Sequence, residues 1–88
     1  MTIEEKILLD KILDSLDDLF DGEKKVIDLH KILLETEAKL SDTKKEINLS
    51  KYISELKCII NSKHTEDKQR EIALDKTNSL RVLLAEIL

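Results

Sequence analysis

The sequence contains no proline and no tryptophan, and its only glycine is Gly22. Proline and glycine interrupt helices, so their near absence permits helices along most of the chain. Strands would use more valine, threonine and aromatic residues, whereas Phe20 and Tyr52 are the only aromatic residues here. The abundant leucine, isoleucine, lysine and glutamate favour helices. A single glycine also excludes a glycine-rich phosphate-binding loop.

Cysteine usage and the N-terminus bear on where the protein resides. The single Cys58 cannot form a disulfide within the chain and falls short of any zinc-binding pattern, so we expect a small apolar filler in a reducing compartment. The acidic start at Glu4 and Glu5 lacks the basic residues of a signal peptide. No apolar run approaches the roughly 20 residues of a membrane span. These features predict a cytoplasmic protein that does not enter a membrane.

The chain has the length of one domain. Its 88 residues, 41% of them hydrophobic and 39% charged, suffice for one core and exclude a disordered acidic tail. We therefore predict an all-α fold, a single-domain antiparallel bundle of three or four helices over residues 1–88.

The first two helices are predicted on either side of Gly22. Thr2 and Glu5 fit a capping box that begins the first helix, and Gly22 favours the left-handed conformation that ends it. The second helix is expected from about Glu23 to Leu40, antiparallel to the first. Apolar residues at helical spacing predict the buried faces. They are Ile3, Ile7, Leu9, Ile12, Leu13, Leu16, Leu19 and Phe20, then Val26, Ile27, Leu29, Leu33 and Leu34, with Ala38 and Leu40.

A third helix is predicted after a polar break at residues 41–43. Thr43 with Glu46 offers a capping box, and Asn48 and Ser50 are alternative caps, so residues 44–48 either extend this helix or form a separate bend. Its apolar face is expected to comprise Leu49, Tyr52, Ile53, Leu56, Ile59 and Ile60.

The last helix is predicted to begin at a Thr65 cap and to reach the C-terminus. The spacing of its apolar residues is typical of a coiled-coil seam. The seam consists of Ala73, Thr77, Leu80, Leu84 and Ile87.

No arrangement in the sequence predicts catalysis or metal binding. Residues 17–28 begin like a calcium-binding loop, but Leu19 stands where Asp or Asn is required and Asp28 where Glu is required. His30 lies beside the apolar face of the second helix, where we expect a neutral imidazole with one hydrogen-bond partner. His64 falls in a polar segment with no second ligand nearby in sequence. We expect no catalytic residue, metal or cofactor.

Acidic residues are concentrated in the N-terminal part of the chain. Residues 1–35 contain ten acidic residues against five lysines, whereas the remainder contains nine against ten basic residues. Four aspartates crowd the end of the first predicted helix, where the helix dipole disfavours each by a few tenths of a kcal/mol, up to about 1. Such departures from local preference are typical of functional surfaces. The predicted partner-binding residues are Asp14, Asp17, Asp18, Asp21 and Glu23, with Asp10 and Asp28 at the periphery.

The charge also indicates which partners to expect. A net charge of −4 and dispersed basic residues disfavour nucleic acid and favour a basic protein. Because Phe20 and Tyr52 are the only aromatic residues, we do not expect an apolar interface built on aromatic anchors. The alternative to a partner site is an ordinary solvated surface, partly balanced by Lys24 and Lys25, with Glu23 and Asp28 capping the second helix.

Residues 19–29, which read LFDGEKKVIDL, resemble a pattern in small helical bacterial immunity proteins. These include partners of contact-dependent growth inhibition toxins and of colicin D-type tRNases. The shared pattern is a first helix, a short turn of glycine and an acidic residue, and a Val-Ile-Asp-Leu helix start. The resemblance implies an antitoxin that binds its cognate nuclease toxin domain and blocks the active site, with carboxylates in the positions of RNA phosphates.

A second hypothesis is a self-associating structural or adaptor protein that binds another basic protein. In this case the seam from Ala73 to Ile87 would pair between two copies of the chain and form a homodimer.

Overall fold

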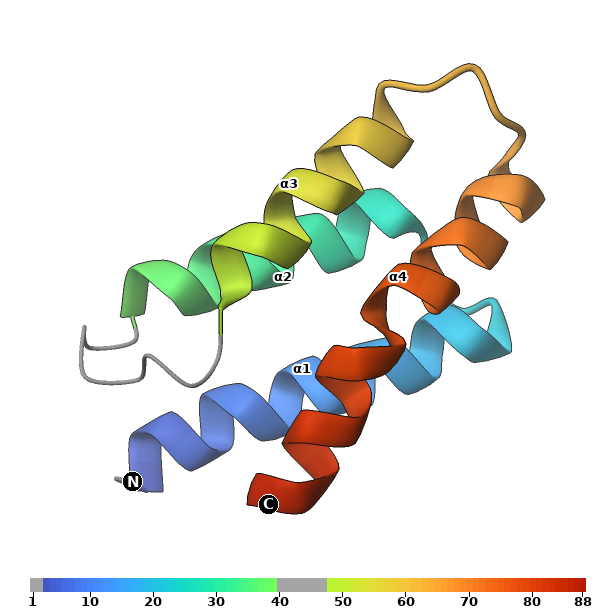
Figure 1. The fold of residues 1–88 in the computed structure, drawn as a ribbon. Coiled ribbons are helices and arrows are strands. Elements are labelled where there is room, and N and C mark those ends of the chain that lie inside the picture. Colours follow the sequence, from blue (N-terminus) through green and yellow to red (C-terminus); the bar gives the residue numbers. More distant parts are fainter. Residues whose placement is uncertain (1–2, 40–47) are drawn as a thin grey trace.

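The computed structural model describes residues 3–39 and 48–88, which form four helices (Figure 1). Helix α1 spans Ile3–Asp21, α2 Val26–Lys39, α3 Leu49–Ile60 and α4 Glu66–Ile87. Helices α1 and α3 each pack against both α2 and α4, so the four helices enclose one core. The fold is the predicted all-α bundle, and it has four helices rather than three.

Several sequence predictions concern residues outside the described part of the chain. They are the capping box of Thr2 with Glu5, the extension of the second helix to Leu40, the polar break at residues 41–43 and the capping box of Thr43 with Glu46.

Helix α1 ends at the glycine, as predicted. Gly22 has a φ of 82°, and its N–H donates a hydrogen bond to the Leu19 carbonyl at 3.2 Å. The N–H of Glu23 donates to the Asp18 carbonyl at 2.9 Å. Together these bonds form a Schellman motif, which satisfies carbonyls that a helix end otherwise leaves without partners.

Helix α2 begins at Val26, so the predicted start near Glu23 was wrong. The N–H groups of Glu23 and Lys24 both donate to the Asp18 carbonyl and therefore belong to the end of α1. The N–H of Lys25 donates to Asp28 Oδ2 at 3.1 Å and thereby caps the new helix. The prediction ignored the residues that a Schellman closure occupies.

Side-chain caps define the starts of α3 and α4. Asn48 Oδ1 accepts a hydrogen bond from the N–H of Lys51 at 3.2 Å, so Asn48 is the cap among the candidates that lie in the described residues. Thr65 Oγ1 accepts from the N–H of Lys68 at 3.3 Å, which confirms the predicted start of α4.

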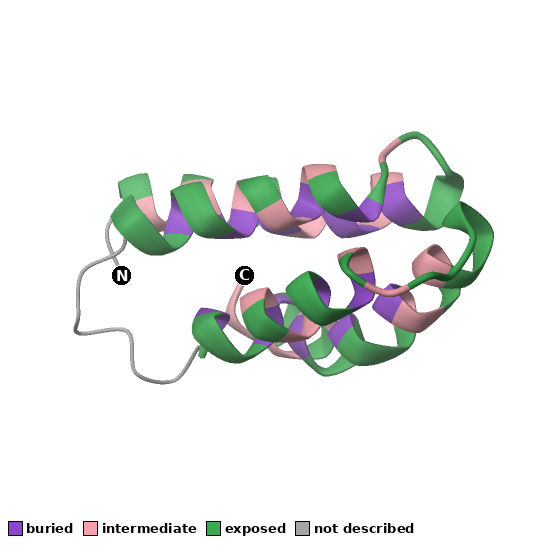
Figure 2. Cartoon of the chain, turned by 90° about the horizontal axis from the view of Figure 1, so that it is seen from above, coloured by how far each residue is buried: buried purple, intermediate pink, exposed green. Residues whose placement is uncertain are grey.

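The core is built from the centre of each predicted apolar face (Figure 2). The predictions were wrong at the edges of α1, where Ile3, Ile7 and Phe20 are 79%, 62% and 65% exposed, and of α2, where Ile27 and Leu34 are nearly half exposed. In a bundle only one stripe of each helix faces its neighbours, so flanking apolar residues remain in solvent. The buried apolar residues are Leu9, Ile12, Leu16, Leu19, Val26, Leu29, Leu33, Leu49, Tyr52, Leu56, Ile59, Ala73, Leu80 and Leu84.

Polar side chains in the core bond to the backbone of their own helix. Ser15, Thr36 and Thr77 each donate to the carbonyl four residues earlier, at 2.8, 2.8 and 2.7 Å. These bonds allow small hydroxyls to be buried without an unsatisfied group. Between helices, the hydroxyls of Tyr52 and Ser79 lie 2.7 Å apart and join α3 to α4.

The apolar seam of α4 is used inside the chain. Ala73, Thr77, Leu80 and Leu84 are buried among the other helices, and Ile87 is partly buried. The seam already packs against α1 and α3, so pairing of the seam between two copies would have to replace contacts of the core.

Two further expectations for single residues were also wrong. Cys58 is exposed rather than an apolar filler. His30 is only half-buried, and its shielded Nε2 atom has no hydrogen-bond partner among the described residues.

None of the described helices has the length and apolar character needed to cross a membrane.

Candidate partner-binding surface

Four aspartates lie in one row along the solvent side of α1. Asp10, Asp14, Asp17 and Asp21 recur at intervals of four, three and four residues, which places them on one side of a helix. The buried stripe of the same helix, Leu9, Ile12, Leu16 and Leu19, faces the opposite way. We call these four aspartates the acidic face.

Two of the seven predicted residues form ion pairs within the chain. Asp17 accepts from the guanidinium of Arg81, which reaches it from α4. Asp18 lies 3.4 Å from Lys24 Nζ, which also donates to Ser15 Oγ at 3.5 Å. All four charged side chains remain partly exposed, so each pair adds at most about 1 kcal/mol to stability.

Two other predicted residues belong to the turn after α1. Asp28 accepts from the N–H of Lys25 and is a structural cap of α2 rather than part of the acidic face. Glu23 is exposed in the turn, next to Asp21, and does not cap α2.

The remaining carboxylates have no internal counterion. Within residues 3–39 and 48–88, Asp10, Asp14, Asp21 and Glu23 form neither an ion pair nor a side-chain hydrogen bond, and all four are exposed. Asp10 and Asp14 are four residues apart on one helix, a spacing at which like charges destabilise it by a few tenths of a kcal/mol. The balance by lysine that the solvated-surface alternative included is therefore found at Asp18, whereas these four carboxylates are solvated without a counterion.

The second predicted counterion, Lys25, is directed away from the acidic face. Its Nζ lies 3.0 Å from Glu66 Oε1 at the start of α4. The hydrogen bond to Glu66 and the negative charge of that carboxylate raise the pKa of Lys25 above its ordinary value. Lys25 therefore pairs with the start of α4, and the cations that pair with carboxylates at the end of α1 are Lys24 and Arg81.

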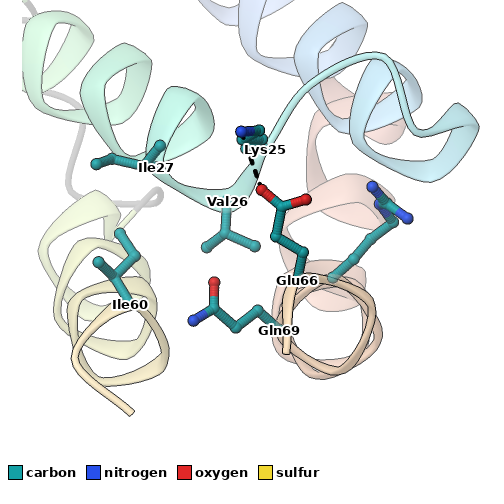
Figure 3. A pocket seen from close by; sticks show the side chains of 7 residues that line it. Lys25, Val26, Ile27, Ile60, Glu66 and Gln69 are labelled. Carbon is teal, nitrogen blue, oxygen red and sulfur yellow. Dashed lines mark ion pairs between the residues drawn. The ribbon is translucent and has the colours of Figure 1, made fainter. Parts of the chain in front are cut away.

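This ion pair forms part of a pocket of about 280 Å³ at the end of the bundle (Figure 3). In the close view Val26 lies at its centre, and Gln69 points toward Val26. Of the charged groups at its edge, Lys25 pairs with Glu66, and Arg70 Nη1 pairs with Asp67 at 3.3 Å, while the shielded Nε of Arg70 has no hydrogen-bond partner among the described residues. The lining contains no histidine, cysteine or hydroxyl that would serve as a nucleophile. It comprises Lys25, Val26, Ile27, Ile60, Glu66, Gln69 and Arg70.

A smaller groove of about 180 Å³ lies between α1 and α4, and we call it the Phe20 groove. Leu16, which is 1% exposed, closes its base, and Phe20 stands at its edge with 65% of its surface in solvent. The sequence pattern does not indicate this groove, because the spacing of Phe20 predicts a core position. The available signal was its position next to Asp21, at the margin of the apolar stripe. The groove is lined by Leu16, Phe20, Leu74, Thr77, Asn78 and Arg81.

The structure thus brings together the acidic face and, beside it, an exposed aromatic residue over a shallow groove. In the part of the chain that the structure describes, no three His, Cys, Asp or Glu side chains are placed to hold a metal ion. No family model matches the chain, and comparisons with curated proteins and with solved structures find no match.

Proposed function

We propose that this chain binds a positively charged protein through the acidic face of α1, and that it acts as an immunity protein that neutralises a nuclease toxin domain. The observation that carries the proposal is the row of Asp10, Asp14 and Asp21, which are exposed on one side of a helix and have no counterion among the described residues. The resemblance of residues 19–29 to immunity proteins supports the choice of partner.

The electrostatics explain why such a surface is suited to this partner. Nuclease clefts are basic because they bind a phosphate backbone. Carboxylates that repel one another on the free helix are stabilised when a basic surface covers them. The same field accelerates encounter, and close charge pairs at such interfaces contribute about 1.5 to 7 kcal/mol of coupling.

The ion pairs within the chain change which residues we expect to make the main contact with the partner. Asp17 and Asp18 must exchange Arg81 and Lys24 for a partner's cation, whereas Asp14 and Asp21 need not. We therefore assign the main contact to Asp10, Asp14, Asp21 and Glu23, with Asp17 and Asp18 as secondary contacts and no contact role for Asp28.

The proposal predicts that an adjacent reading frame encodes a large secreted protein with a nuclease-like C-terminal domain. The test is inhibition of that domain. We expect an equimolar amount of the chain to suppress RNA cleavage by that domain. The variant Asp14→Asn with Asp21→Asn should require a higher concentration, and the difference should shrink as salt is raised. The matched control is Asp75→Asn with Glu86→Gln, which removes the same charge from exposed positions of α4.

Two results would contradict the proposal. If the control variant loses as much inhibition as the α1 variant, then net charge rather than the acidic face is responsible. If the chain binds the domain without slowing cleavage, the adaptor hypothesis is favoured over the immunity hypothesis.

A further inference from the structure

We infer that the Phe20 groove receives one apolar side chain of the basic partner, while lysine or arginine residues on either side of that side chain contact the acidic face. This inference rests on the proposed function and adds an apolar anchor to it. It assigns a contact role to Phe20 and Leu74, which are not among the predicted partner-binding residues.

Phe20 has the properties of an interface anchor. It is 65% exposed, whereas the other aromatic residue, Tyr52, is 6% exposed and already bonded to Ser79. Aromatic residues are enriched at the centres of protein interfaces, where a few well-packed side chains dominate binding. The inference therefore departs, at Phe20, from the expectation that the chain has no aromatic anchor.

The groove offers an apolar floor beside that ring. Leu16 and Thr77 are buried at its base, and Leu74 of α4 lines it with Phe20 of α1. Its volume of about 180 Å³ exceeds that of a few water molecules, each of which occupies roughly 30 Å³ in the liquid. One leucine or phenylalanine side chain is therefore a suitable occupant.

Charge decides the chemistry around that side chain. Asp17 is three residues from Phe20 on α1 and therefore lies beside the groove, whereas Asp21 follows Phe20 in the sequence and lies about 100° further round the helix, on the acidic face. Arg81 also lines it, but its charge is held by Asp17. The charges of Asp17 and Arg81 balance each other at the groove, and the acidic face beside it is negative at Asp14 and Asp21. These surroundings favour an apolar side chain with basic neighbours over one with acidic neighbours.

The test compares two synthetic peptides with the same length and the same number of lysines. One contains only lysine and glutamine, and in the other one central glutamine is replaced by leucine. Titration calorimetry at low salt should show that the leucine raises the affinity for the wild-type chain roughly tenfold, because the side chain leaves water. Phe20→Ala should abolish this gain, and Phe20→Leu should retain part of it.

A matched control separates the groove from general surface hydrophobicity. Val82 is 50% exposed on α4 and does not line the groove, so Val82→Ala should leave the gain intact. Circular dichroism should show unchanged helicity for all three variants, because Phe20 and Val82 are largely outside the core.

The two proposals fail in different ways. Suppose that binding of the lysine–glutamine peptide depends on Asp14 and Asp21. If leucine then gives no gain in affinity, or if the gain survives Phe20→Ala, the inference about the Phe20 groove is wrong and the proposed role of the acidic face is retained. If neither peptide binds, both are overturned. If only the leucine peptide binds and its affinity does not depend on Asp14 and Asp21, the inferred basic partner is wrong.

Discussion

Arg81 of α4 binds the carboxylate of Asp17 on α1, although 64 residues separate them in the sequence. The pair links the C-terminal half of α4 to the end of α1. It also gives an internal counterion to one of the central carboxylates of the cluster that the sequence indicated as a partner site. The acidic face consequently has less unbalanced negative charge at Asp17 than at Asp14 and Asp21.

Disruption of this pair should have a small, coupled effect on stability. Asp17 and Arg81 side chains are 49% and 42% exposed, so we expect a coupling free energy of about 0.2 to 1 kcal/mol between Asp17→Asn and Arg81→Gln. Urea denaturation of the two single variants and the double variant measures it. Strictly additive effects would show that the pair does not form in solution.

Neutralising Asp14 should stabilise the protein. Asp14 lacks a counterion among the described residues and lies one turn from Asp10, Asp17 and Asp18. Asp14→Asn removes this repulsion, and we expect a gain of about 0.2 to 0.5 kcal/mol in the free energy of unfolding. The measurement is thermal or urea denaturation at low salt, and the gain should diminish at high salt. A loss of stability would mean that Asp14 has a favourable contact that the fold does not show.

Truncation of the α4 seam should unfold the monomer rather than dissociate an oligomer. Leu80 is fully buried between helices, so Leu80→Ala should cost about 2 to 5 kcal/mol. Sedimentation should give the same molecular mass for this variant and for the wild type. A dimeric wild type that becomes monomeric with Leu80→Ala would contradict the internal packing of the seam.

Gly22 should be sensitive to any added side chain because of its backbone conformation. Gly22→Ala is expected to cost about 1 kcal/mol, because a φ of 82° is unfavourable for alanine. Crowding does not contribute, since the nearest atom to an added Cβ is the guanidinium carbon of Arg70 at 3.8 Å. Gly22→Asn should cost less than Gly22→Ala, because asparagine tolerates this conformation better. Equal losses in urea denaturation would point to a steric cause instead.

The Lys25–Glu66 pair should make stability depend on alkaline pH. Since the pKa of Lys25 is raised in the folded state, its contribution is complete below the ordinary value of 10.5 and is lost as pH rises through the higher folded value. Glu66→Gln should lower the pKa of Lys25, which NMR titration of its side chain would detect. An unchanged pKa would mean that this exposed pair is not populated.

Most helix boundaries followed from the sequence because they depend on neighbouring residues. Gly22, Asn48 and Thr65 act through bonds to groups no more than a few residues away, and each stands at a helix end in the fold. The start of α2 was predicted too early because the local bonds that end α1 also use the N–H groups of Glu23 and Lys24.

The sequence alone determined an all-α bundle, the centre of each buried stripe and the concentration of acidic residues in the first helix, since helical period and composition carry that information. Only the tertiary structure decided which carboxylates keep a free charge and which apolar residues stay in solvent. Asp17 is neutralised by a residue from the other end of the chain, and Phe20 is exposed because α4 covers one side of α1 and leaves the groove open. Such long-range contacts depend on how the helices pack, which local spacing does not specify.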